Sequence, residues 1–126
     1  MRTEILTKAA PAPIGPYAQA VEVGGFIFCS GQIPLDPVTG AVVGEGNVEL
    51  QVVQVIKNIT ALLAEAGVNL SHVVKTTMFL KNMSDFPKVN AIYGEHFKAP
   101  YPARTTIEVA RLPKDVLVEI EVIVKK

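Results

Sequence analysis

The sequence is poor in the residues that carry redox and metal chemistry. It has one cysteine, Cys29, and two histidines, His72 and His96, which lie far apart along the chain. A single cysteine excludes an internal disulfide, and these positions do not match the spacing of a zinc site. Neither histidine accompanies a plausible nucleophile, so a hydrolytic triad is not expected. We therefore expect no metal, and we interpret Cys29 as a small buried hydrophobic residue.

The sequence also lacks an excess of charge of either sign. Twelve Lys and Arg residues balance twelve Asp and Glu residues, so the formal net charge is zero. Binding to nucleic acid depends on attraction between basic side chains and phosphates, and no basic stripe is visible. Nucleic acid is therefore not the expected partner.

Long apolar runs are absent as well. No segment reaches the ~18 apolar residues that a membrane-spanning helix needs, so no membrane association is expected. Glu4 and Lys8 interrupt the apolar run that a secretory signal would require, which favours a cytoplasmic location. The length of 126 residues and the hydrophobic content of 49% are typical of one globular domain, which we expect to span residues 1–126.

Apolar residues recur with the period of a strand or a helix along most of the chain. Gly24 and Gly25 separate two apolar runs and predict the turn of a tight hairpin. Asn47 can cap the first helix, and Gly67 can end it in a left-handed turn. The predicted elements are strands at 2–7, 17–23 and 26–30, a helix at 48–66, a strand at 73–81, a second helix after Ser84, and strands at 104–110 and 116–124.

Two predicted elements in the middle of the chain have one apolar face each. The strand at 73–81 is expected to bury Val74, Met78 and Leu80. Ser84 can cap the helix that follows. The apolar stripe of this helix, with Asn90 on its flank, consists of Phe86, Val89, Tyr93 and Phe97. The order of elements predicts an α+β fold in which both helices cover a single face of one sheet.

The last two predicted strands carry charged residues in their interiors. In the final strand, alternation turns the aliphatic residues at even positions of 116–124 towards the helices and Glu119 and Glu121 away from them. If these two strands form an antiparallel hairpin, Arg104 and Thr106 project from the same helix-free face as the two glutamates.

Such a helix-free face is either open to water or packed against another copy of the chain. Leu117, Ile123 and Phe79 share it with the charges and favour packing, so we predict a homo-oligomer with the charges at clefts between subunits. Arg104 in such a cleft needs a carboxylate as its partner. That carboxylate is either a glutamate of the last strand or a ligand.

Four segments resemble the RidA (YjgF) family of reactive-intermediate deaminases, and together they span nearly the whole chain. They are IGPYAQA at 14–20, SGQIPLDP at 30–37, VVKTTMFLKNMSDFPKVN at 73–90 and PARTTIEVARLPKDVLVEIE at 102–121. The resemblance implies a chorismate-mutase-like α+β fold with a single mixed β-sheet, and a homotrimer with a ligand site at each subunit interface. It also implies hydrolysis of 2-imino acids, such as 2-iminobutanoate and 2-iminopropanoate, to 2-oxo acids and ammonia without metal or organic cofactor. The implied functional partner is a pyridoxal-phosphate-dependent dehydratase that releases enamines.

The same resemblance assigns roles to individual residues. It assigns Arg104 to the substrate carboxylate and Glu119 to the attacking water. Thr106 stands where many relatives carry Cys, and it can replace that residue if the contact is made mainly by the backbone. The other positions that match the lining of the family's pocket are Tyr17, Ser30, Gly31 and Asn90.

Two other functions stay open at the level of sequence. Some members of the family have been assigned a nuclease or translation-inhibiting role, against which the zero net charge argues. A regulatory trimer that binds 2-oxo acids without turning them over would use Arg104 equally well. A small pocket around Tyr17 favours small aliphatic imino acids as substrates.

Overall fold

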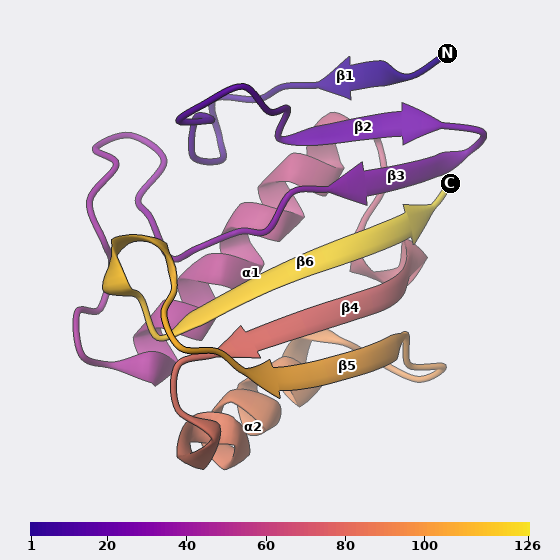
Figure 1. The fold of residues 1–126 in the computed structure, drawn as a ribbon. Helices are drawn as coiled ribbons and strands as arrows, with labels where there is room; N and C mark the ends of the chain where they lie inside the picture. Colours follow the sequence, from indigo (N-terminus) through magenta and orange to yellow (C-terminus); the bar gives the residue numbers. More distant parts are fainter.

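Six strands form one mixed β-sheet in the order β1-β2-β3-β6-β4-β5, and both helices lie against one of its faces (Figure 1). The structure is a computed structural model that describes residues 1–126. The elements are β1 (Thr3–Ile5), β2 (Ala20–Val23), β3 (Phe26–Cys29), α1 (Val48–Glu65), β4 (Val73–Leu80), α2 (Phe86–His96), β5 (Ala103–Glu108) and β6 (Val118–Lys125). The predicted α+β fold, with one mixed sheet and two helices on a single face, is confirmed.

The hairpin and the first helix form where local signals predict them. Gly24 and Gly25 have φ angles of 59° and 80°, the left-handed conformation that the tight turn between β2 and β3 requires. The Asn47 side chain accepts a hydrogen bond from Leu50 N at 3.0 Å and so caps α1. Gly67, with φ of 77°, follows the end of the helix. Neither helix combines the length and the apolar character needed to cross a membrane.

The core lies between the helices and the sheet. Every second residue of β6 from Val118 to Val124 is buried, as the alternation predicts. Burial of one such aliphatic side chain contributes about 1.5–3 kcal/mol, so this layer fixes which face of β6 carries Glu119. The residues of α1 with which β6 shares this core are Val52, Val55, Ile56, Ile59, Leu62 and Leu63.

The last two strands do not form the predicted hairpin. β5 pairs in parallel with β4, and β6 lies between β3 and β4, antiparallel to both. The segment from β4 through α2 to β5 is the crossover connection that parallel neighbours need. Residues 109–117 then return the chain to the middle of the sheet (Figure 1). The prediction was wrong because strands that follow one another in sequence usually pair, whereas here β4 separates them.

This parallel pairing reverses the predicted orientation of β5. Arg104 stands opposite Thr76, and Thr106 stands opposite Met78. Both of these β4 residues are fully buried in the core, so Arg104 and Thr106 project from the helix side of the sheet. The two glutamates of β6 project from the helix-free face, as predicted. Arg104 and Glu119 therefore lie on opposite faces of the sheet.

Two smaller predictions were wrong at the ends of elements. A β-bulge near the start of β4 turns Val73 into the core and leaves Val74 43% exposed, because an extra residue shifts the alternation by one. Ser84 does not cap α2. It lies within a short 3-10 turn, Met83–Asp85, and Asp85 occupies the cap position without a side-chain hydrogen bond.

Candidate functional site

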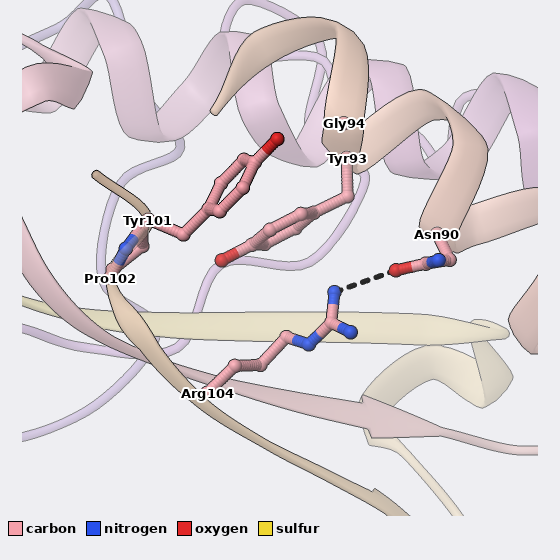
Figure 2. A pocket seen from close by; sticks show the side chains of 6 residues that line it. All are labelled: Asn90, Tyr93, Gly94, Tyr101, Pro102 and Arg104. Carbon is pink, nitrogen blue, oxygen red and sulfur yellow. Dashed lines mark hydrogen bonds between the residues drawn. The ribbon is translucent and has the colours of Figure 1, made fainter. Parts of the chain in front are cut away.

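One face of α2 holds Arg104 in place. Arg104 Nη1 donates a hydrogen bond to Asn90 Oδ1 at 2.7 Å (Figure 2). Its guanidinium carbon lies 4.8 Å from the centre of the Tyr93 ring and 5.3 Å from the centre of the Phe86 ring. Phe86, Asn90 and Tyr93 are spaced as i, i+4 and i+7, so a regular helix presents all three on one side. We call Phe86, Asn90, Tyr93 and Arg104 the arginine cluster.

The guanidinium of Arg104 keeps free donors for a ligand. A guanidinium group has five N–H donors, and one of them is used within the chain. The chain contains two ion pairs, Arg111–Asp115 and Lys126–Glu22, and neither includes Arg104. An ion pair with a glutamate of β6, one of the two partners expected from the sequence, is thus not made within the chain. An oriented arginine without an ion-pair partner suits a carboxylate, whose two oxygens match the fork of the guanidinium.

Arg104 opens onto a pocket of about 430 Å³ (Figure 2). Sequence reasoning did not identify Tyr93 or Tyr101 as part of a site, because aromatic residues at helical spacing also mark a buried stripe. Thr106 lies two residues beyond Arg104 on the same side of β5 and is half-buried. The residues that line the pocket are Asn90, Tyr93, Gly94, Tyr101, Pro102 and Arg104.

A second group of predicted site residues is connected through Gly31 to Glu119 on β6. Gly31 packs so closely on this side chain that a Cβ at Gly31 would lie 2.9 Å from Glu119 Cδ. Ser30 fixes the loop, because its hydroxyl and its backbone N–H donate to the carbonyl oxygens of residues 18 and 19 at 2.6 Å and 2.9 Å. Tyr17 and Gly31 line one small cavity of about 40 Å³. We call Tyr17, Ser30, Gly31 and Glu119 the glutamate cluster.

The environment of Glu119 makes its carboxyl group a weaker acid than an ordinary glutamate, with a raised pKa. Burial raises the pKa of the Glu119 carboxyl above its usual range, and the neighbouring carboxylate of Glu121 raises it further. Glu119 takes part in neither of the ion pairs of the chain. A carboxyl group with a raised pKa that packs against Gly31, a residue of the cavity lining, is a candidate general base.

Other groups in the chain do not offer the same chemistry. Burial raises the pKa of the Cys29 thiol to about 12, which keeps it protonated and unreactive near neutral pH. No three His, Cys, Asp or Glu side chains lie close enough together to hold a metal ion. The two clusters are therefore the best candidates for a functional site.

A single chain does not bring the two clusters together. Arg104 projects from the helix side of β5, and Glu119 projects from the opposite side of β6, with β4 between the two strands. Neighbouring strands lie ~4.8 Å apart, so β5 and β6 are roughly 10 Å apart. Arg104 and Glu119 also stand opposite different positions of β4, Thr76 and Phe79, and their side chains project from opposite faces. The prediction that both residues share one face was wrong, and a small ligand cannot contact both within one chain.

Comparison with known proteins gives close relatives. Residues 7–126 match the family model described as Endoribonuclease L-PSP. The chain is 60% identical to a RutC family protein of Synechocystis over 118 residues, which are 93% of this chain and 91% of that protein. It is 48% identical to the 2-iminobutanoate/2-iminopropanoate deaminase of Salmonella typhimurium, over 98% of this chain and 97% of that protein. A crystal structure of a conserved Rid family protein from Yersinia pestis matches all of both chains with a TM-score of 0.97 and 48% identity.

These similarities cover both clusters. The family model includes every residue of the arginine and glutamate clusters, and the matched relatives align over nearly their full lengths. The same strand order and helix placement that separate Arg104 from Glu119 are therefore shared with a solved member of the family. The chain belongs to the RidA/YjgF family, the Rid family, whose model carries the L-PSP description.

Proposed function

We propose that the protein hydrolyses 2-imino acids of the 2-iminobutanoate and 2-iminopropanoate type to 2-oxo acids and ammonia. The observation that carries the proposal is the Arg104 guanidinium, which α2 orients beside a pocket and which has no carboxylate partner in the chain. A 2-imino acid has a carboxylate next to an electrophilic carbon, so its hydrolysis needs a cation and an activated water. The Salmonella relative at 48% identity carries the name of this activity.

In the proposed reaction Arg104, oriented by Asn90, binds the carboxylate of the substrate. Glu119 accepts a proton from a water molecule whose oxygen bonds to the imine carbon, the C=N electron pair moves to the nitrogen, and Glu119 returns the proton to that nitrogen. The hydroxyl group of the tetrahedral product then gives its proton to Glu119 as the C=O bond forms and the C–N bond breaks, and the departing nitrogen takes this proton and leaves as ammonia. Positioned acid–base catalysis of this kind is worth about a hundred- to ten-thousandfold, which suffices because imines also hydrolyse spontaneously in water.

The other predicted residues shape the pocket. The N–H of Gly31 donates to no acceptor in the chain and is available to the substrate. Ser30 uses its hydroxyl within the loop, so we assign it to holding Gly31 in position. Tyr17 is half-exposed and provides an apolar wall on the side of the glutamate cluster, while the half-buried Thr106 provides one on the side of Arg104.

We place each complete site between two copies of the chain, with the arginine cluster of one copy facing the glutamate cluster of the next. Because the clusters lie on opposite faces, each copy uses two different surfaces, and contacts of this heterologous kind form a ring when the rotation from one copy to the next closes on itself. A ring of three is the homotrimer that the family resemblance implies, with three shared sites. Its contact surface would include apolar residues of the helix-free face such as Val23, Phe26, Phe28 and Ile107, each between 39% and 43% exposed.

Two other functions account for fewer of these features. Endoribonuclease activity, which the family description names, depends on attraction to phosphates, and the net charge of the chain is zero. A regulatory trimer that only binds 2-oxo acids uses Arg104 but gives Glu119 no role. We assign the protein to the removal of reactive imines that pyridoxal-phosphate-dependent dehydratases release in the cytoplasm, with no cofactor of its own.

Arg104→Ala is expected to lower kcat/KM by about a hundredfold, because a paired charge that holds the substrate carboxylate is lost. Glu119→Gln keeps the shape of the side chain but removes the base, so kcat is expected to fall by about a hundredfold with little change in KM. The measurement follows the decay of freshly generated 2-iminobutanoate and the appearance of the 2-oxo acid.

Two exposed residues outside the clusters provide controls for these variants. Arg111→Ala and Glu65→Gln remove the same types of side chain and are expected to keep the native rate. If the Arg104→Ala variant hydrolyses the imine at the native rate, the proposal is contradicted. Binding of 2-oxobutanoate by the unmodified protein with no acceleration of imine decay favours the regulatory alternative.

Glu121→Gln is expected to shift the acid limb of the pH–rate profile to lower pH. Only ionised Glu119 accepts a proton from water, so the rate falls as pH drops through its pKa. The carboxylate of Glu121 is one of the two causes that raise this pKa, so its removal lowers the pKa and preserves activity at lower pH. Profiles of kcat for both proteins on the same imine measure the shift, and Glu65→Gln serves as the control. An acid limb that stays at the same pH, or that shifts to higher pH, contradicts the role of Glu119.

Gly31→Ala is expected to lower kcat by about tenfold or more, because small displacements of a catalytic group cost rate steeply. The added Cβ collides with the carboxylate end of Glu119, a flexible group that can swing aside, so the fold is expected to persist. Steady-state kinetics and thermal unfolding separate the two effects. If the loss arises through Glu119, Gly31→Ala causes no further loss in a Glu119→Gln background, and an additive loss contradicts this.

A further inference from the structure

We propose that Tyr93 is a positioning residue for Arg104, and that it acts by fixing the plane of the guanidinium group. The inference rests on the proposed function, in which Arg104 binds the substrate carboxylate. It goes beyond that function because the proposed reaction assigns no role to Tyr93. Three features of the arginine cluster carry it: the immobility of the Tyr93 ring, its placement over Arg104, and the arrangement of the remaining contacts to the guanidinium.

The Tyr93 ring is held on more than one side. It is 5% exposed, and its hydroxyl forms a buried hydrogen bond of 2.9 Å with Thr76 Oγ1 on β4. It also stacks on Phe97, with ring centres 4.3 Å apart and planes inclined by 19°. A buried Tyr whose hydroxyl is paired has little freedom to turn, so the ring is a rigid surface.

The guanidinium lies over this rigid ring. The Arg104 guanidinium carbon is 4.8 Å from the ring centre of Tyr93, within the range of a cation–π contact (Figure 2). Thr76, which anchors the Tyr93 hydroxyl, stands directly opposite Arg104 in the register between β4 and β5. One position on β4 therefore sets both the place of the ring and the point from which the arginine side chain begins.

The contacts of Arg104 with Asn90 and Phe86 do not fix the orientation of its guanidinium plane, so the Tyr93 ring determines it. Asn90 accepts a single hydrogen bond from Nη1, which fixes the position of one nitrogen but permits rotation about it. Phe86 is half-buried, and its ring centre is farther away, at 5.3 Å. A planar, delocalised guanidinium packs against an aromatic ring more specifically than a compact ammonium does. A fork that is already oriented loses less conformational freedom when it binds both carboxylate oxygens.

The test replaces the ring while the rest of the pocket stays in place. Tyr93→Leu is expected to raise KM for the imine and Kd for 2-oxobutanoate by about three- to tenfold, because a cation–π contact with Arg104 is lost. The value of kcat is expected to stay within about twofold of that of the native protein. Because Leu leaves a cavity, Tyr93→Met is made as a second variant, whose side chain has a similar volume but is longer and flexible and so reaches further into the space of the ring without an aromatic face. The double variant Tyr93→Phe with Thr76→Val keeps the ring and its stacking on Phe97 but removes the hydroxyl anchor, so a rise in KM smaller than that of Tyr93→Leu is expected.

A double-mutant cycle with Arg104→Lys separates positioning from a general structural effect. A lysine ammonium is a point charge without a plane, so Tyr93→Leu or Tyr93→Met is expected to change Kd less than about twofold in that background. Equal losses in the native and Arg104→Lys backgrounds overturn the inference, as does native Kd in both Tyr93 variants. Failure of the proposed function looks different, because Arg104→Lys alone then leaves hydrolysis and oxo-acid binding unchanged. If Arg104→Lys is impaired and the cycle is additive, only the role of Tyr93 is refuted.

Discussion

The parallel pairing of β5 with β4 decides where Arg104 lies. In a strand each side chain has only two directions, so the choice of partner and register settles on which face a functional group appears. Opposite Thr76, Arg104 turns towards α2 and meets Asn90 and Tyr93. Glu119, fixed by the aliphatic residues of β6 that enter the core, turns the other way. The separation of the two groups thus follows from the sheet itself, and it is the reason why the proposed site needs two copies of the chain.

Helix α2 serves both the core and the candidate site. Val89 and Tyr93 enter the core together with Phe97, which follows the helix, while Asn90 and the ring of Tyr93 reach the guanidinium of Arg104. The packing that stabilises the helix therefore also limits the movement of the group proposed to bind substrate. The glutamate cluster has a similar dependence, because the loop that carries Gly31 is anchored by hydrogen bonds to residues 18 and 19. In both clusters, groups buried for stability define the geometry of groups that stay accessible.

Structural features that depend on the residues of a single element could be predicted from the sequence. Gly24 and Gly25 marked the hairpin, and the alternation in β6 identified its buried face. The partner of β5 could not be predicted in this way, since alternation relates the residues of one strand to each other but not to the rest of the sheet. The bulge that exposes Val74 left no mark in the sequence, and tertiary pairing alone reveals it.

The candidate site was predictable to a lesser extent than the fold. Arg104 and Glu119 stood out as charges inside strands, but their roles came from the family resemblance and stay predictions. Tyr93 read as a core residue, which it is, and its contact with Arg104 became visible only when β5 was placed beside β4. Gly31 gave no sign of its proximity to Glu119, because the two belong to segments far apart in the chain.

Sharing of each site between two copies is tested most directly by mixing two inactive variants. Arg104→Ala and Glu119→Gln proteins are unfolded together in equal amounts, refolded and assayed on 2-iminobutanoate, with each variant treated alone as the control. If every site takes its arginine from one copy and its glutamate from the next, random assembly into a ring leaves about a quarter of the sites with both native residues. We predict recovery of about a quarter of the native rate from the mixture. Recovery no greater than that of the separate variants, from proteins that demonstrably assemble together, would contradict the shared site.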